Sequence, residues 1–293
     1  MGFTVVALCA LTAGSVGVAD EPSVSEALGL LKALEKTRTS FKPFRLNGTL
    51  RRPFLNADDK TTFRVDCEDA KYRVTSLGSR RRVAVYDGEQ LLTYDGQQNA
   101  AIMKPEERSS SALAFDPRTL GFSTGLYSDL TLKENLAYHS AKDTVIVDIP
   151  PGRRQSGLVG VELTDRFAQR IRFEVENHAP YRVHYYSKTI SRKDGKGIFA
   201  TYTTTTEYWP EQSENWIPKK LTAFTQYGDD DQKVVESVVE FERPEFVSEI
   251  APSTWTIAGL SLPFGEPVVD LRIKQRIGYW NGAELVEQVP VRK

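Results

Sequence analysis

The strongest constraint on the fold is a stretch of short strand-forming runs separated by Asp-Gly pairs. Residues 80–104 read RRRVAVYDGEQLLTYDGQQNAAIMK, with Asp87-Gly88 and Asp95-Gly96 between the runs. Asp-Gly suits a two-residue type I′ turn, because both central positions need positive φ and primed turns match the twist of the flanking strands. The stretch therefore predicts an antiparallel meander.

Apolar residues occupy both faces of this meander. Val83 and Val85 point to one face, and Ala84 and Tyr86 point to the other. The pair Leu91-Leu92 repeats the pattern on the next strand. A sheet with water on one side would alternate apolar and polar residues. Either helices pack on the second face, or the sheet curves around an apolar hollow.

Apolar and polar residues alternate, with a period of two, along most of the remaining chain. The strands expected outside the meander cover 44–50, 61–68, 71–77, 144–149, 158–163, 169–176, 181–189, 199–209, 219–227 and 233–242. Clusters of Gly, Pro, Asn and Asp separate them. Long, evenly spaced strands without a second domain boundary predict one large antiparallel β-domain.

Two helices and a lid are expected beside the strands. Ser23 and Glu26 form a capping box, and the apolar stripe that follows predicts a helix ending near Thr37 that must dock on the sheet. Residues 105–126 are rich in Ser, Pro and Gly but also hold aromatic residues and leucines, which favours a lid over disorder. A short helix is expected over 128–136.

The first residues look like an export signal. Residues 3–19 form an apolar run that ends in small residues before Asp20, as in a signal peptide cleaved between Ala19 and Asp20. We therefore expect a signal peptide over 1–19, a single curved antiparallel β-domain over 20–270, and a C-terminal hairpin or extended tail over 271–293. The mature protein would be periplasmic or secreted.

Removal of the leader would leave Cys67 as the one remaining cysteine, so no intrachain disulfide can form. Cys67 alternates with Phe63 and Val65 on a predicted strand. This pattern indicates a buried structural thiol rather than a nucleophile.

Charge gives no sign of a nucleic-acid partner, since the formal net charge is −1. Basic residues gather at Arg51-Arg52, Arg80-Arg81-Arg82 and Arg153-Arg154. No aromatic stacking motif accompanies them, so we interpret them as solvated strand ends and loops.

No motif of an enzyme is present, and we expect neither a catalytic site nor a cofactor. The chain lacks GxSxG, HExxH, P-loop and dinucleotide-binding patterns. His178 and His184 would lie about 20 Å apart along a strand, which is too far for one metal ion. No metal site is expected.

The order of these features resembles the periplasmic lipoprotein-carrier superfamily, of the outer-membrane lipoprotein-sorting type. The likeness covers residues 22–270 and rests on a leader, an amphipathic helix and a long run of strands containing VYDGEQLLTYDG. It implies a mainly β fold with minor helix: a large curved antiparallel sheet, or half-open β-barrel, around an apolar cavity closed by helices. It also implies a carrier or sensor of acyl chains. Tyr86, Leu92 and Tyr94 fall where the meander of the family lies.

Two functions follow. In the first, the exported protein binds a lipid or an acylated protein in an apolar concavity without catalysis. Its ligand-binding residues would be Tyr86, Leu92, Tyr94, Phe115 and Phe122. In the second, it is a structural or interaction protein of the cell envelope with a filled core. Exposed residues Trp255, Tyr279 and Trp280 would then dock its C-terminal tail onto an envelope protein partner.

Overall fold

The computed structural model describes eleven segments of the chain. They cover residues 24–55, 59–78, 81–97, 100–104, 116–121, 145–148, 158–164, 169–192, 197–211, 214–228 and 232–291. The expected leader over 1–19, the expected helix over 128–136, and Phe115 and Phe122 lie outside these residues.

The described segments are mostly β-structure around one α-helix, α1 (Val24–Thr39). The strands are β1 (Phe44–Arg51), β2 (Lys60–Glu68), β3 (Lys71–Ser76), β4 (Val83–Tyr86), β5 (Leu91–Tyr94), β6 (Ala100–Met103), β7 (Val145–Asp148), β8 (Leu158–Thr164), β9 (Arg170–Glu176), β10 (Val183–Ser191), β11 (Ile198–Glu207), β12 (Lys220–Tyr227), β13 (Lys233–Phe241), β14 (Glu245–Phe246), β15 (Pro267–Asp270), β16 (Gln275–Trp280) and β17 (Leu285–Val286). Within the described residues, no helix has both the length and the apolar character that crossing a membrane requires.

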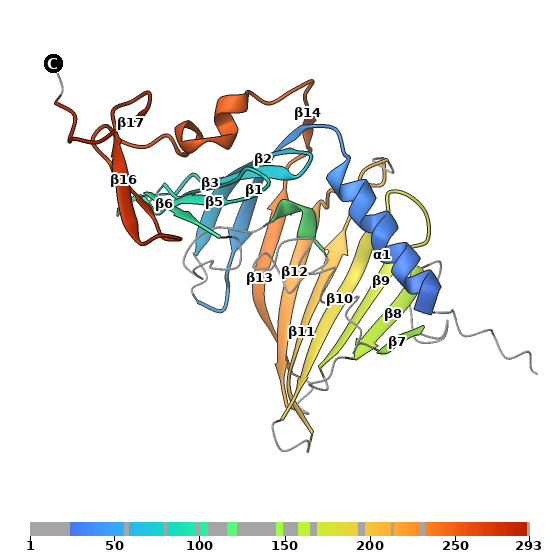
Figure 1. Cartoon of the computed structure of the whole chain (residues 1–293). Helices are drawn as coiled ribbons and strands as arrows, with labels where there is room; N and C mark the ends of the chain where they lie inside the picture. The colour runs from blue at the N-terminus through green and yellow to red at the C-terminus, as the bar shows by residue number, and fades with distance from the viewer. Residues whose placement is uncertain are drawn as a thin grey trace, which may run out of the picture.

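All the strands belong to one curved sheet with two wings. Strands β7 to β13 pair in chain order and form the tall wing in Figure 1. Strand β1 joins β13, and β1 to β6 continue in chain order as a second wing. Strands β15, β16 and β17 extend that wing beyond β6, and the short β14 pairs with β1. The expected large curved antiparallel sheet is confirmed, with one exception: β15 runs parallel to β6.

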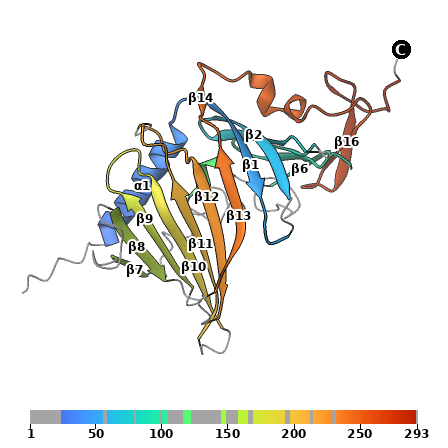
Figure 2. The same ribbon diagram turned by 180° about the vertical axis from the view of Figure 1, so that it is seen from behind.

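Helix α1 docks on the β7–β13 wing, as its apolar stripe predicts. Leu31 and Leu34 are buried against residues of β8, β9 and β10, including Phe173 and Tyr186. Figure 2 shows α1 lying behind these strands, so that it covers one face of the wing. We call this face of the sheet the inner face.

The inner face continues across the junction into the second wing. Leu221 of β12 lies opposite Val239 of β13, and Val239 lies opposite Leu50 of β1. The three side chains belong to one apolar cluster that also holds Cys67. Cys67 is buried, as predicted, and burial raises the pKa of its thiol.

The opposite, outer face of the second wing is covered by the C-terminal part of the chain. Two short 3₁₀ helices, η4 (Pro252–Trp255) and η5 (Ile257–Leu260), lie over β3, β4 and β5, as Figure 1 shows. Val83, Val85 and Leu92 are buried there together with Trp255 and Trp280. Both faces of the meander are thus covered, and on the outer face the cover is a returning segment of the chain.

The expected exposure of Trp255 and Trp280 is wrong. Their side chains are 5% and 6% exposed. The reason is that the outer face of β4 and β5 offers them an apolar surface, and burying aromatic side chains there removes a large area from water. Tyr279 is half-buried, with the Arg276 guanidinium 4.8 Å from its ring centroid.

The expected type I′ turn at Asp87-Gly88 is also wrong. Gly88 has a positive φ of 108° but Asp87 does not, and Tyr86 pairs with Leu91 across a four-residue loop. Asp87 Oδ1 accepts hydrogen bonds from the backbone N–H groups of Glu89 and Gln90, both at 2.9 Å. The aspartate side chain therefore closes this hairpin as an Asx turn, which needs no positive φ at the aspartate.

Candidate apolar ligand site

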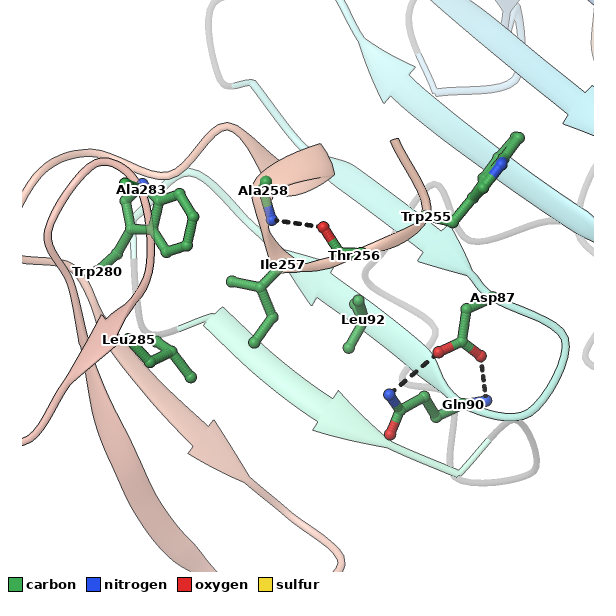
Figure 3. Close-up of a pocket in the computed structure, with 10 residues that line it drawn as sticks. All are labelled: Asp87, Gln90, Leu92, Trp255, Thr256, Ile257, Ala258, Trp280, Ala283 and Leu285. Atoms are coloured by element: carbon green, nitrogen blue, oxygen red, sulfur yellow. Dashed lines mark hydrogen bonds between the residues drawn. The ribbon is translucent and has the colours of Figure 1, made fainter. Parts of the chain in front are cut away.

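An apolar pocket of about 440 Å³ opens on the outer face of the second wing. It lies between the β4–β5 hairpin on one side and the segment that holds η4, η5, β16 and β17 on the other, as Figure 3 shows. The lining residues are Asp87, Gln90, Leu92, Trp255, Thr256, Ile257, Ala258, Trp280, Ala283 and Leu285.

Hydrogen bonds hold the Trp255 side chain and the Trp280 backbone at the walls of the pocket. The indole Nε1 of Trp255 donates to Glu68 Oε2 of β2 at 3.2 Å, which sets the plane of the ring. The backbone N–H of Trp280 donates to the carbonyl of Glu266 at 2.9 Å, and its own carbonyl accepts from the N–H of Gly265 at 2.7 Å. These bonds position the Trp255 ring and the Trp280 backbone beside the pocket.

A tight junction between η4 and η5 positions the third wall. Thr256 begins η5 with its Oγ1 accepting from the Ala258 N–H at 3.3 Å. Gly259 lies so close to η4 that an added Cβ would come within 2.0 Å of the Thr254 carbonyl oxygen. Because no side chain fits there, the glycine lets the two turns stack and present Ile257 and Ala258 to the pocket.

One end of the pocket is polar. Gln90 Nε2 donates to Asp87 Oδ2 at 3.1 Å, and this pair faces the apolar walls in Figure 3. A site with apolar walls and a few polar groups at one end suits a ligand with an apolar body and a polar end.

The structure divides the residues that the sequence assigned to one site. Leu92 lines the pocket, and Tyr94 belongs to the same outer cluster. Tyr86 lies on the inner face, where its ring centroid is 5.4 Å from that of Tyr72 and its hydroxyl donates to the Gly88 carbonyl at 2.7 Å. Tyr86 is therefore not brought together with Leu92 and Tyr94.

The inner face carries a buried ion pair that sequence reasoning missed. Arg118 donates from Nε to Asp116 Oδ1 at 2.8 Å and from Nη2 to Oδ2 at 2.7 Å. Its guanidinium lies 5.7 Å and 5.8 Å from the ring centroids of Tyr72 and Tyr86. Burial alone would lower the pKa of Arg118, but the Asp116 carboxylate outweighs burial and raises it.

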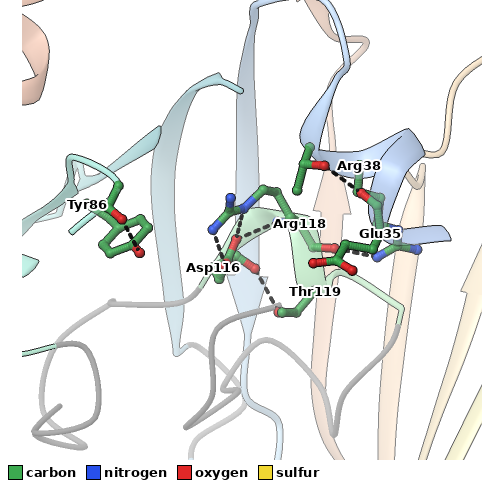
Figure 4. A network of polar contacts seen from close by, with 8 residues as sticks. Glu35, Arg38, Tyr86, Asp116, Arg118 and Thr119 are labelled. Carbon is green, nitrogen blue, oxygen red and sulfur yellow. Dashed lines mark hydrogen bonds and ion pairs between the residues drawn. The ribbon is translucent and has the colours of Figure 1, made fainter. Parts of the chain in front are cut away.

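A second buried arginine ties α1 to this pair. Arg38 is 1% exposed, and its Nη1 donates to the carbonyls of Arg118 at 2.5 Å and Leu120 at 2.9 Å, as Figure 4 shows in part. Its guanidinium lies 4.9 Å from the Trp216 ring, and burial lowers its pKa to about 10. Within the described segments, Arg38 Nε and Nη2 have no hydrogen-bond partner.

A local signal for the ion pair was present in the sequence. Asp116 followed by Pro117 is the pattern of a helix N-cap with proline at the first position, and Asp116 does cap a 3₁₀ turn over Pro117–Thr119. No comparable signal marks Arg38, because a basic residue in the last turn of a helix is ordinarily solvated.

Metal ligation has no visible basis in the described part of the chain. There, no three His, Cys, Asp or Glu side chains come together as metal ligands. His184 Nε2 instead lies 3.2 Å from Glu176 Oε1, which also accepts from Arg182.

Several solved structures align with this chain at low sequence identity. A LolA superfamily protein, NE2245 from Nitrosomonas europaea, aligns over 80% of this chain and 99% of its own, with 13% identity and a TM-score of 0.47. A DUF1329 family protein from Desulfovibrio piger aligns over 81% of this chain and 98% of its own, with 9% identity and a TM-score of 0.41. MucB aligns over 81% of this chain and 65% of its own, with 14% identity and a TM-score of 0.32.

No protein-family model matches the sequence, and no curated protein matches it.

Proposed function

We propose that the chain is a non-catalytic protein of the cell envelope, exported through a leader over residues 1–19, that binds a lipid-like or acylated ligand. The observation that carries this proposal is the 440 Å³ outer pocket, with walls of Trp255, Trp280 and Leu92 and a polar end at Asp87 and Gln90. Its volume lies within the range of about 300–1,000 Å³ that is usual for small-molecule sites.

The physical basis of binding would be apolar burial against prearranged walls. Each Å² of apolar ligand surface removed from water contributes about 25 cal/mol. The indole of Trp255 is already held by its bond to Glu68, so little side-chain freedom is lost when a ligand enters. The polar end can then orient a headgroup or an ester through hydrogen bonds.

Native mass spectrometry of residues 20–293 purified from an envelope fraction tests the proposal, combined with organic extraction of the same sample. We expect a discrete added mass that extracts as lipid. A protein that carries no extractable mass and takes up no apolar fluorescent probe would contradict ligand binding.

Variants then test the place of binding. Ile257 and Leu285 are half-buried pocket residues, so glutamine at either position adds polarity to the wall without opening the deeper core. We expect probe uptake to fall in Ile257→Gln and Leu285→Gln and to be unchanged in the control Val289→Gln, whose side chain is 60% exposed outside the pocket. Uptake that survives both pocket variants would refute the site.

A second candidate function is docking onto an envelope protein partner. Val289 and Val291, which are 60% and 84% exposed, favour it, because they lie in the tail beyond β17. Deletion of residues 287–293 would then remove partner binding and leave probe uptake intact. Loss of both activities, or of neither, would exclude a separate docking role for the tail.

A further inference from the structure

Arginines gather around a single aspartate on the outer face of β1, β2 and β3. Arg45 lies opposite Asp66, and Asp66 lies opposite Arg73, so the three side chains form one row across the sheet. Arg64 is on the same face of β2 as Asp66, because it is two residues away along the strand. With Arg81 these side chains line a pocket of about 300 Å³, which the segment at Ile250, Ala251 and Thr254 closes on one side.

The charges in this pocket do not balance. Asp66 Oδ1 is 3.5 Å from Arg45 Nε and 3.3 Å from Arg64 Nη2, and Asp66 Oδ2 is 3.9 Å from Arg73 Nη1. One carboxylate therefore faces three guanidinium groups at distances longer than those of a bidentate pair, and Arg81 adds a fourth positive charge to the pocket lining. Burial, followed by the charges of Arg81 and Arg64, lowers the pKa of Arg73 despite the presence of Asp66.

Two donors in the cluster have no acceptor. The Nε atoms of Arg45 and Arg73 are buried and make no hydrogen bond within the described residues. Arg45 Nε is near Asp66 Oδ1 but lacks the geometry of a hydrogen bond to it. Buried N–H groups nearly always have partners, so the unmet donors call for an acceptor that enters the pocket.

We propose that this pocket is a binding site for a phosphate-type oxyanion. A tetrahedral oxyanion offers several acceptor oxygens at once, and the planar guanidinium fork matches that geometry better than any other cation in proteins. Its charge would also offset the repulsion among arginines that Asp66 alone leaves. A volume at the lower end of the usual range suits a phosphate or a small headgroup better than an acyl chain.

The position of the site gives two sources for such a phosphate. Thr254 walls the arginine pocket and the next residue, Trp255, walls the apolar pocket, so the two pockets flank η4. The oxyanion is either the headgroup of a phosphate-bearing lipid or a free, water-soluble phosphate. The arginine geometry stands without the apolar pocket, so the oxyanion site does not depend on the function proposed above.

Isothermal titration of residues 20–293 with inorganic phosphate, at constant ionic strength set by chloride, tests the site. Arg64 is the matched target, since its side chain is 44% exposed and its removal leaves the core closed. The control is Arg51, which lies on the same face of β1 as Arg45 but outside the pocket. Its guanidinium is paired with Glu240 at 2.7 Å. We expect Arg64→Gln to weaken phosphate binding about tenfold or more, and Arg51→Gln to bind as the wild type does.

Two further ligands separate the sources. Stronger binding of glycerol 3-phosphate than of inorganic phosphate, with flotation on phosphatidylglycerol but not phosphatidylcholine vesicles, would assign the site to a lipid headgroup. Equal or weaker binding of glycerol 3-phosphate, without flotation, would assign it to the free ion. Two results would overturn the proposal. One is a titration with phosphate that gives no more heat than a titration with chloride. The other is phosphate binding that Arg64→Gln and Arg45→Gln both leave unchanged.

Discussion

Two arginine–aspartate clusters lie on opposite faces of the second wing, and they differ in how their charges are matched. On the inner face, Arg118 and Asp116 form a bidentate pair, one cation for one anion, and both side chains are buried. On the outer face, Asp66 faces several arginines at 3.3 Å or more. The pKa of Arg118 is raised whereas that of Arg73 is lowered.

The difference separates a structural ion pair from an incomplete one. Asp116 binds the guanidinium of Arg118 through both carboxylate oxygens, and this pair fixes the segment at 116–121 against the inner core. Asp66 cannot satisfy its neighbours, and their buried Nε atoms remain open to an added anion. The outer cluster, whose unpartnered donors belong to arginines that line a pocket, is therefore a better candidate for a ligand site than the complete inner ion pair.

The largest expected effect comes from breaking the matched pair. Asp116→Asn would leave Arg118 buried without a counter-charge, and we expect a loss of about 3–5 kcal/mol in the free energy of unfolding, measured by urea denaturation. The control is Asp59→Asn, which breaks the partly exposed pair between Asp59 and Arg52 and should cost about 1 kcal/mol or less. Equal losses in the two variants would show that the inner pair is not structural.

A second matched carboxylate should make stability depend on pH. Burial alone would raise the pKa of Glu176, but hydrogen bonds from Arg182 and His184 outweigh it and lower the pKa. The folded state therefore favours the carboxylate, and its contribution is present above the usual pKa of about 4.3 and lost as the pH falls through the lowered value.

The variant Glu176→Gln tests whether the Glu176 carboxylate stabilises the folded state at neutral pH. We expect the variant to lose about 1–3 kcal/mol at pH 7 relative to the wild type, and the gap to narrow as the pH falls below 4.3. Urea midpoints at pH 7, 5, 4 and 3 measure the gap. A gap that stays constant down to pH 3 would mean that the Glu176 charge does not stabilise the fold.

The outer cluster around Asp66 should tolerate the loss of the Asp66 carboxylate. We expect Asp66→Asn to cost about 1–2 kcal/mol, because its contacts to half-exposed arginines are long, and to bind inorganic phosphate more tightly than the wild type. Denaturation and titration on the same sample test both parts. If Asp66→Asn lowers the free energy of unfolding as much as Asp116→Asn does, the outer cluster is a structural ion pair like the inner one.

The smallest effect is expected at Tyr86, which lies beside the matched pair. Tyr86→Phe keeps the ring near Arg118 and removes the hydrogen bond to the Gly88 carbonyl, so about 1 kcal/mol should be lost. The control Tyr227→Phe, at a position that is 53% exposed, should change little. A larger loss at Tyr86 would show that its hydroxyl supports the inner face beyond the hairpin.

The strands were predictable because alternation is a local property. Expected strands at 158–163 and 233–242 became β8 (Leu158–Thr164) and β13 (Lys233–Phe241), and the helix at the N-terminus became α1. Pairing was not predictable in the same way. Gly48 lies opposite Phe241, and Val268 lies opposite Ala100, across more than a hundred residues of chain that no local period can span.

The sites were harder to predict than the strands. Leu92 is predicted as a ligand-site residue and lines the apolar pocket. The other walls, Trp255 and Trp280, come from a segment without periodicity, and the expectation that they are exposed is wrong. Arg81 is predicted to be solvated because no aromatic stacking motif accompanies its basic run. The pocket that it lines could not be predicted, because the register of β1, β2 and β3 is what brings Arg45 and Arg73 beside Asp66.

The parallel pairing of β15 with β6 also sets an order of events during folding. The β7–β13 wing can assemble from strands adjacent in the chain, but the second wing waits for residues 267–270 to complete its edge. Until then, β6 presents unpaired backbone groups, and the outer side chains of Val83, Val85 and Leu92 stay in water. During synthesis from the N-terminus, β6 therefore exists before its partner strand β15, with an unpaired strand edge and an uncovered apolar face that are prone to aggregation until the last strands are made.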